Sequence, residues 1–117
     1  MVLFVESANF TRDIGRYMND EEYRRLQVRL LRQPQAGAVM PGCGGLRKIR
    51  APDRRRGKGS RGGLRIIYLD IPEINWIFML DIYDKDEQDD LSPDEKRQLA
   101  ALAARLRLEA IRRNEGT

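Results

Sequence analysis

The chain has 117 residues, of which 41% are hydrophobic and 34% are charged, and these proportions are typical of one soluble globular domain. No apolar run approaches the ~20 residues that a membrane-spanning helix needs, and the opening MVLFVESANF lacks the basic leader and long apolar stretch of a signal peptide. The chain has no histidine and one cysteine, Cys43. An intrachain disulfide is therefore excluded, and we expect a cytoplasmic protein.

The first half of the chain predicts a strand followed by two helices. Residues 1–5 form an apolar strand, and Ser7 is a suitable N-cap for a first helix. Asn19 and Glu22 have the spacing of a capping box that opens a second helix. Pro34 ends that helix because its ring cannot follow a helical neighbour.

The middle of the chain predicts three strands separated by loops. Residues 35–45 are rich in glycine and form a loop, and residues 46–50 form a strand. Residues 51–63 are a run of Pro, Gly, Lys and Arg that we expect to be an exposed loop. Residues 64–71 and 74–83 are the clearest strands, and a tight connection predicts that they form a hairpin. In the second of these strands, regular alternation places Ile82 on the same face as the even-numbered residues before it.

A helix follows residue 92. Ser92 serves as N-cap, Pro93 occupies the first helical position, and Glu95 completes a capping box. The predicted order is strand, helix, helix, three antiparallel strands, helix. The fold class is therefore α+β, a single domain over residues 1–117 with helices packed on an antiparallel sheet.

Charge is unevenly distributed along the chain. The net charge is +4, yet residues 44–65 carry nine basic side chains and one acid. Residues 81–95 carry eight acids and one base, Lys85. The basic segment indicates a polyanion partner, and nucleic acid is the obvious one.

Several kinds of chemistry are disfavoured by the residue types available. A metal site is not expected, because carboxylates are the main ligands on offer, and the acids near Asp86 are explained by a solvated helix entry. Gly57 to Ser60 lack the first spaced glycine of a phosphate-binding Walker loop. Nucleophilic catalysis that needs histidine is excluded. We expect no cofactor.

The remaining chemistry belongs to the cationic side chains. Arginine forks match two phosphate oxygens and stabilise charge that develops on phosphorus. A lysine near other cations has a lowered pKa and can accept a proton from a ribose 2′-OH, which allows metal-free cleavage of RNA. The alternatives are a solvated loop, or a patch that binds nucleic acid without acting on it.

Strand alternation selects individual residues. Arg65 shares a face with Leu69, while Tyr68 lies on the opposite face. Tyr83, at the end of the next strand, can stack on a base, and Lys85 points to the same side if the strand continues. An equally plain interpretation of Tyr83 is an aromatic residue that covers the core.

Several segments together resemble one family. They are FVES, DEEYRRLQ, GGLRKIR, KGSRGGLRIIY, IYDKDE and the pattern L-x-P-D-E-K-x-Q-L. With them the chain resembles the HigB/RelE superfamily of type II toxins over residues 3–109, and more narrowly its HigB branch. The resemblance implies a compact fold like that of microbial ribonucleases. It also implies an endoribonuclease that cleaves mRNA in the A site of the 70S ribosome through attack by the 2′-OH.

The resemblance also assigns roles to residues. The strand positions and the basic segment make Tyr83 a catalytic candidate, and Arg50 and Tyr68 RNA-binding candidates. The resemblance implies catalytic roles for Arg65 and Lys85, and RNA binding by Arg47, Lys48, Lys58 and Arg61. It implies a cognate antitoxin, a HigA-like helix-turn-helix protein. Some relatives place an arginine after the basic residue at the end of the last strand, whereas here Asp86 follows Lys85.

Two other functions fit the same pattern. One is inhibition of DNA gyrase by a ParE-like toxin, because one fold supports several functions. The other is a non-catalytic RNA-binding module, which predicts salt-sensitive binding without cleavage.

Overall fold

A computed structural model describes residues 1–56, 63–84 and 91–116. Its main elements are β1 (Leu3–Glu6), α1 (Ala8–Tyr17), α2 (Asp20–Arg32), β2 (Ala38–Val39), β3 (Arg47–Ala51), β4 (Leu64–Ile71), β5 (Trp76–Asp84) and α3 (Pro93–Glu115). Two short 3-10 turns are η1 (Arg54–Arg56) and η3 (Pro72–Ile74). The predicted α+β class is confirmed, and β2 is an additional strand inside the predicted loop 35–45.

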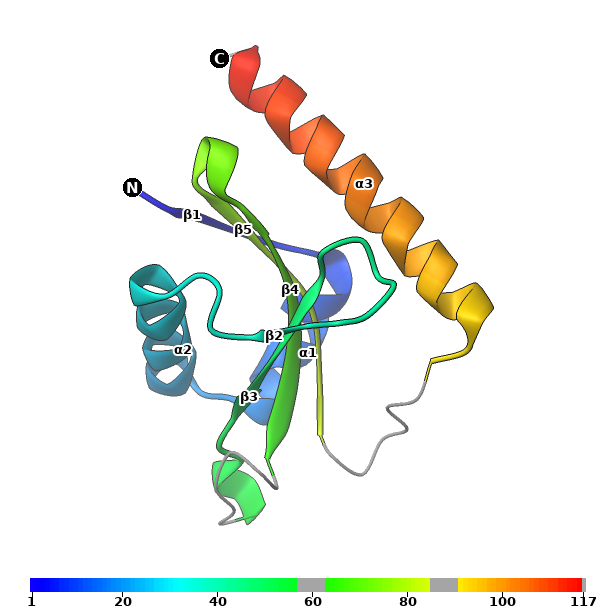
Figure 1. Ribbon diagram of the computed structural model, residues 1–117. Coiled ribbons are helices and arrows are strands. Elements are labelled where there is room, and N and C mark those ends of the chain that lie inside the picture. The colour runs from blue at the N-terminus through cyan, green and yellow to red at the C-terminus, as the bar shows by residue number, and fades with distance from the viewer. Residues whose placement is uncertain (57–62, 85–90, 117) are drawn as a thin grey trace.

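The strands form one mixed sheet in the order β1-β5-β4-β3-β2 (Figure 1). Strands β2 to β5 pair antiparallel, but β1 pairs parallel with β5. The prediction of an entirely antiparallel sheet was therefore wrong at β1. Only strands joined by a tight turn must run antiparallel, and two helices and three strands separate β1 from β5 along the chain.

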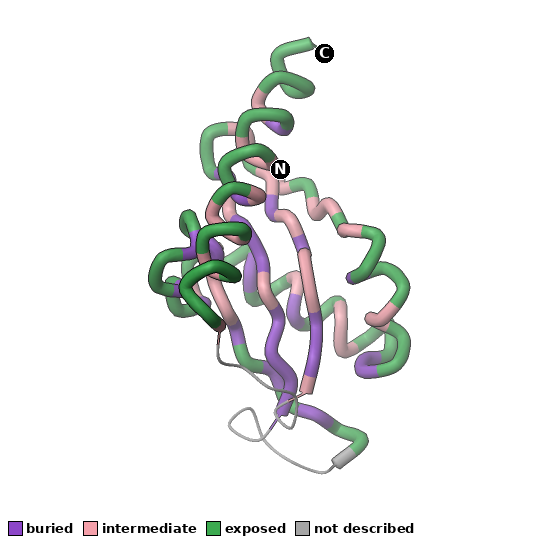
Figure 2. The backbone as a smooth tube through the Cα atoms, turned by 90° about the vertical axis from the view of Figure 1, so that its right-hand side faces the viewer, coloured by how far each residue is buried: buried purple, intermediate pink, exposed green. Residues whose placement is uncertain are grey.

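Helices cover the sheet on both faces. Helices α1 and α2 pack on one face over a cluster that includes Phe10, Leu30 and Tyr68. Helix α3 and the loop before β3 cover the other face over a cluster that includes Leu46 and Leu69. Figure 2 shows the buried residues concentrated in the strands between these layers. One face of the sheet therefore packs on α1 and α2 and the other on α3, so the face on which a strand residue lies decides which helices it contacts.

The helix starts follow the predicted caps. The Ser7 hydroxyl accepts a hydrogen bond from the backbone of the first turn of α1. Asn19 with Glu22, and Ser92 with Glu95, form complete capping boxes at α2 and α3. Each box satisfies two backbone N–H groups that a helix start leaves unpaired.

A glycine in the loop before β3 allows α3 to lie close to that loop. Gly44 has a φ of +70°, and a Cβ built on it would lie 2.9 Å from the Cα of Ala100. Further along α3, Arg107 reaches Glu73 in η3, with 3.9 Å between Nη1 and Oε1. These contacts hold the middle of α3 against the domain.

The pairing of β4 with β5 changes register once. Ile67 lies opposite Asp81, whereas the next residue of β4 lies opposite Met79, so Leu80 is an extra residue in β5. Such a β-bulge reverses the facing of every later residue. Ile82 accordingly joins the α1/α2 cluster. The prediction that Ile82 shares a face with the even-numbered residues before it was wrong, because alternation assumes an unbroken ladder.

Candidate functional site

Three candidate residues form a row across the sheet. Arg50 on β3 is paired with Arg65 on β4, and Arg65 is paired with Tyr83 on β5. Residues directly opposite each other in a ladder point to the same face. Arg65 shares its face with Leu69, which belongs to the α3-side cluster. The row therefore lies on the α3 face, at the end of the sheet where β5 finishes.

The β-bulge is what places Tyr83 beside Arg65. Before the bulge, odd-numbered residues of β5 such as Ile77 and Met79 belong to the α1/α2 cluster. After it, Asp81 and Tyr83 line a hollow beneath α3 instead. Without the extra residue, Tyr83 would point to the opposite face from Arg65.

Arg65 is a buried cation. Its side chain is 8% exposed, and its Nη1 donates to the carbonyl oxygen of Gly63 at 2.8 Å. A buried charge is tolerated only when it is paired or hydrogen-bonded. The arrangement fixes the guanidinium in one direction, and fixed donors stabilise charge that develops during a reaction better than mobile ones do.

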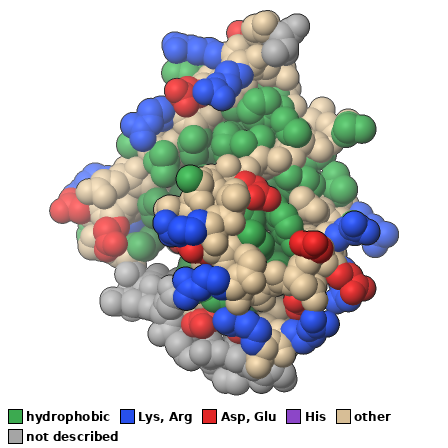
Figure 3. All heavy atoms as spheres, turned by 180° about the vertical axis from the view of Figure 1, so that it is seen from behind, with side chains coloured by type: hydrophobic (Ala, Val, Ile, Leu, Met, Phe, Trp, Pro, Cys, Tyr) green, Lys and Arg blue, Asp and Glu red, His purple; other side chains and the backbone are tan. Residues whose placement is uncertain are grey.

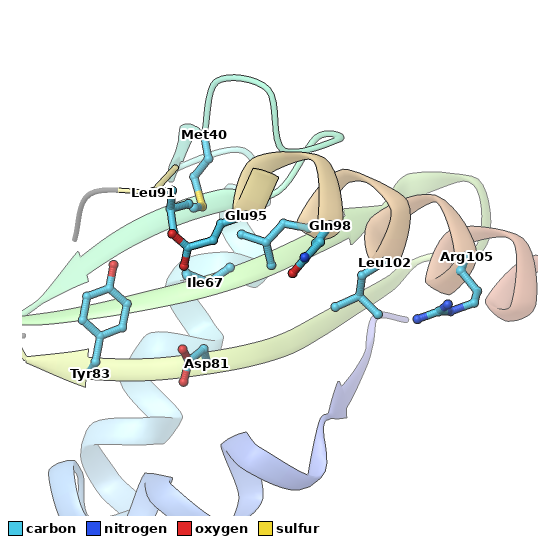
Figure 4. A pocket seen from close by; sticks show the side chains of 10 residues that line it. Met40, Ile67, Asp81, Tyr83, Leu91, Glu95, Gln98, Leu102 and Arg105 are labelled. Carbon is cyan, nitrogen blue, oxygen red and sulfur yellow. The ribbon is translucent and has the colours of Figure 1, made fainter. Parts of the chain in front are cut away.

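An open hollow of about 540 Å³ adjoins Tyr83 between the sheet and the first turns of α3. Its lining residues are Met40, Ile67, Asp81, Tyr83, Leu91, Glu95, Gln98, Leu99, Leu102 and Arg105. Figure 4 shows Tyr83 and Asp81 standing on β5 and facing Glu95 and Leu91 from the α3 side. The hollow combines apolar side chains with the carboxylates of Asp81 and Glu95 on the side of Tyr83 and the guanidinium of Arg105 at the other end. Beside Tyr83 it therefore suits a flat, polar-edged group better than an anion.

A second row lies one step further along the sheet. Lys48 on β3 is opposite Ile67, and Ile67 is opposite Asp81. Lys48 and Arg50 therefore share the α3 face with Arg65 and lie toward the β3 edge. The structure brings these two predicted RNA-binding residues to the same face as two predicted catalytic ones.

Two other predicted RNA-binding residues lie on the opposite face. Arg47 donates from Nη1 to the carbonyl oxygens of Gly37 at 2.8 Å and Gln35 at 3.3 Å. Tyr68 has no exposed surface; its hydroxyl donates to the Pro34 carbonyl oxygen at 2.7 Å and accepts from the Gly37 N–H at 2.9 Å. Burial raises the pKa of the Tyr68 hydroxyl. The assignment of RNA binding to Tyr68 is corrected, because its side chain presents no surface to a ligand.

Three predicted site residues, Lys58, Arg61 and Lys85, lie outside the described residues. In the sequence, Lys85 follows Tyr83 by two residues, and Arg61 precedes Arg65 by four. Their roles stay predictions.

One residue that the sequence analysis did not select organises the start of the basic loop. The Arg55 guanidinium contacts both Asp53 oxygens, donates to the Arg16 carbonyl oxygen at 3.2 Å and stacks 4.7 Å from the Tyr17 ring centroid. It also lies 3.7 Å from a carboxylate oxygen of Asp84. Ala51 and Asp53 are buried, so the prediction that the whole of 51–63 is exposed was wrong at its start. In the run Arg54 to Arg56, nothing in the sequence distinguishes the arginine that pairs with the buried Asp53.

Asp81 is the other functional candidate that sequence reasoning missed. An acid inside an otherwise apolar strand is uncommon unless it has a partner, and that was the available signal. Across the described ranges, no group of three or more His, Cys, Asp or Glu residues is arranged to hold a metal ion. No helix in those ranges is long and apolar enough to cross a membrane.

The fold and the site define an α+β domain in which an exposed arginine, a buried arginine and a buried tyrosine form a row across the α3 face of the sheet. Among solved structures, the chain is similar to the Escherichia coli toxin RelE, in a double arginine-to-alanine mutant in the free state. The TM-score is 0.53 at 18% sequence identity, and the match covers 86% of this chain and 95% of that chain. The chain therefore has the RelE-like fold. No protein-family model matches the sequence.

Proposed function

We propose that this protein is the toxin of a type II toxin–antitoxin system and that it cleaves mRNA in the A site of the translating ribosome. The observation that carries the proposal is the pairing of the largely buried Arg65 with Tyr83, beside the exposed Arg50, on the α3 face of the sheet. The similarity to RelE, which is named a toxin, supports it. Within the superfamily we assign the chain to the HigB branch on its sequence segments.

The proposed reaction is an intramolecular transesterification, in which the ribose 2′-OH attacks the adjacent phosphodiester. The 2′-oxygen forms a bond to phosphorus while the bond from phosphorus to the 5′-oxygen breaks, leaving a 2′,3′-cyclic phosphate and a 5′-hydroxyl. The proton of the 2′-OH passes to a base, and the leaving 5′-oxygen receives a proton. Arg65 stabilises the charge on the non-bridging oxygens, with Arg50 beside it. We assign the proton transfers to Lys85 and Tyr83.

The surroundings of the row suggest how the substrate is oriented. Asp81 and Glu95 line the hollow on the side of Tyr83, whereas Arg105 lines it at the other end (Figure 4). The two acids disfavour a phosphate beside Tyr83. The phosphate therefore lies over the arginines, and a base occupies the hollow, where Tyr83 can stack on it. Carboxylates accept hydrogen bonds from the exocyclic amino groups of bases, so Asp81 favours bases that carry one.

Positive charge from side chains replaces the role that a metal ion has in many nucleases, so we propose a metal-independent reaction. With no histidine in the chain, the rate depends on positioning, and the ribosome supplies part of it. The proposed partners are a HigA-like antitoxin that covers or distorts the basic face, the 70S ribosome and mRNA. We propose that the protein acts in the cytoplasm.

The test is primer extension on a defined mRNA, incubated with the purified protein with and without translating ribosomes at matched magnesium concentrations. We expect cuts at codon positions only when ribosomes are present. Arg65→Gln and Tyr83→Phe are expected to lose the cuts, while Tyr68→Phe keeps them. Because Arg65 is buried, circular dichroism must first show that Arg65→Gln is folded.

The opposite outcome is equally informative. If expression arrests growth but no cut appears with or without ribosomes, the nuclease proposal is wrong. A gyrase supercoiling assay with the same protein then tests the ParE-like alternative.

A further inference from the structure

The outer face of α2 carries a row of exposed arginines. Arg24, Arg25, Arg29 and Arg32 are all exposed, and helical spacing places them on one side of the helix, away from the buried Leu26 and Leu30. They border a shallow surface hollow of about 620 Å³ together with Glu21, Val28 and Gln33. Figure 1 shows α2 at the outside of the molecule, so this face meets solvent.

Intramolecular pairing accounts for only two of these arginines, Arg25 with Glu21 and Arg29 with the Arg50 carbonyl oxygen. Glu21 is the one acid that lines the hollow, and it is paired with Arg25 at 3.0 Å. Within the described ranges, Arg24 and Arg32 make no hydrogen bond or ion pair. Favourable interaction with the helix dipole explains Arg29 and Arg32 in the last turn, but it does not explain Arg24 and Arg25. Like charges three and four residues apart destabilise a helix, and the single carboxylate of Glu21 cannot neutralise four arginines, so this surface keeps a net positive charge.

The arginine face is continuous with the candidate site. Arg29 also lines a second hollow, of about 550 Å³, which includes Lys48 and Arg50. Its Nη1 donates to the Arg50 carbonyl oxygen at 2.9 Å. Met40 lines this second hollow and also the one that contains Tyr83. A path of shared lining residues therefore leads from the site, across the β3 edge, to α2.

We propose that the α2 arginine face, formed by Arg24, Arg25, Arg29 and Arg32, is a second RNA-binding surface that holds the phosphate backbone of RNA outside the cleavage site. The proposal rests on the proposed function, because the RNA is that of the ribosome–mRNA complex. Guanidinium forks match phosphate oxygens, and the row extends about 12 Å along the helix, enough to meet several phosphates. Contacts of this kind carry no sequence information and serve to position the protein.

The test measures RNA binding separately from cleavage. A folded Arg65→Gln protein is titrated with a fluorescent RNA hairpin over a series of salt concentrations. The variant Arg24→Gln/Arg25→Gln/Arg32→Gln is compared with Arg97→Gln/Arg112→Gln/Arg113→Gln on α3, which removes the same charge from exposed positions. Arg29 is kept because it bonds to the β3 backbone. Each lost phosphate contact lowers the slope of log Kd against log salt by roughly 0.7 to 0.9.

We expect the slope to fall by about 2 to 3 for the α2 variant and by less than 1 for the α3 variant. Equal changes in the two variants would overturn the proposal, since only net charge would then matter. It would also be overturned if the α2 variant lost binding to anionic phospholipid vesicles while keeping its RNA slope.

The outcome is independent of the nuclease assay. If the wild-type protein cuts no mRNA but the slope falls as expected, the RNA-binding surface stands and the nuclease proposal fails. If the wild-type protein cuts mRNA and the salt slope of the α2 variant is unchanged, the nuclease proposal stands and the RNA-binding surface on α2 is wrong.

Discussion

The guanidinium of Arg55 spans both carboxylate oxygens of Asp53, with Nε 3.0 Å from Oδ1 and Nη2 2.9 Å from Oδ2. Asp53 has no exposed surface, and the Asp53 carboxylate raises the pKa of the Arg55 guanidinium. Because Arg55 also stacks on Tyr17 and lies near Asp84, this pair joins the start of the basic loop to the end of α1 and to the end of β5.

The Asp53–Arg55 pair is therefore expected to stabilise the domain. We predict that Asp53→Asn lowers the free energy of unfolding by about 1.5 to 3 kcal/mol, the range for hydrogen bonds to charged groups. Urea denaturation measures it. Arg54→Ala is the control: its contact with Glu22, at 3.7 Å, is on the surface and is worth less than about 1 kcal/mol. Equal losses in the two variants would contradict the prediction.

The two tyrosines of β4 and β5 are predicted to have separable roles. Tyr68→Phe leaves the Pro34 carbonyl and the Gly37 N–H without their buried partner, so we expect a loss of about 1 to 3 kcal/mol in stability with cleavage retained. Tyr83→Phe is expected to remain folded and to lose cleavage. Thermal denaturation and primer extension on the same preparations test the pair. A Tyr83→Phe protein that cuts normally would remove Tyr83 from the chemistry.

Gly44 is predicted to be irreplaceable beneath α3. Gly44→Ala adds a methyl group 2.9 Å from the Ala100 backbone at a φ of +70°, so α3 must shift. We expect a loss of more than about 1 kcal/mol, because the new residue is incompatible with the native backbone. Gly15→Ala, at an exposed position in the last turn of α1, meets nothing within 4 Å and should gain up to about 1 kcal/mol. Chemical denaturation of the two variants measures these opposite signs.

Asp70 is predicted to make stability fall as pH rises through the acid range. Burial raises the pKa of its carboxyl above the ordinary value of 3.8, although Arg47 and Arg107 oppose this. The folded state therefore holds the proton more tightly than the unfolded chain, and ionisation above the ordinary pKa removes stability.

We expect Asp70→Asn to lack this dependence. Its stability relative to the wild type should rise from pH 3 to pH 7, as measured by urea denaturation across that interval. A variant that is less stable than the wild type at pH 7 would show that the ionised carboxylate contributes favourably to the fold.

The apolar surface of the α3-side cluster is incompletely covered. Trp76, Phe78 and Leu80 are only partly buried against α3. Seen from behind, hydrophobic side chains form a band across the upper half of the molecule, with Lys and Arg side chains around it (Figure 3). Helix α3 is thus too narrow to cover the whole sheet face.

The sequence by itself determined the elements and most of their ends. Capping boxes, proline positions and apolar runs act over a few residues, so Ser92, Asn19 and the 64–71 strand were predictable from their neighbours alone. Arg65 was identified on the correct face because β4 is regular, and the basic composition of 44–65 pointed to phosphate.

Tertiary structure decided which of these residues meet. The extra residue Leu80 places Tyr83 on the same face as Arg65 and Ile82 on the opposite face. A bulge arises from the pairing of two strands rather than from either strand alone. Strand alternation separates Tyr68 from Arg65, and Arg47 from Lys48 and Arg50, but only packing shows that Tyr68 faces α1 and α2 and that Arg47, its partner across the strands, shares that face. One residue of register reverses a side chain's face, and register is fixed only when distant segments pack together.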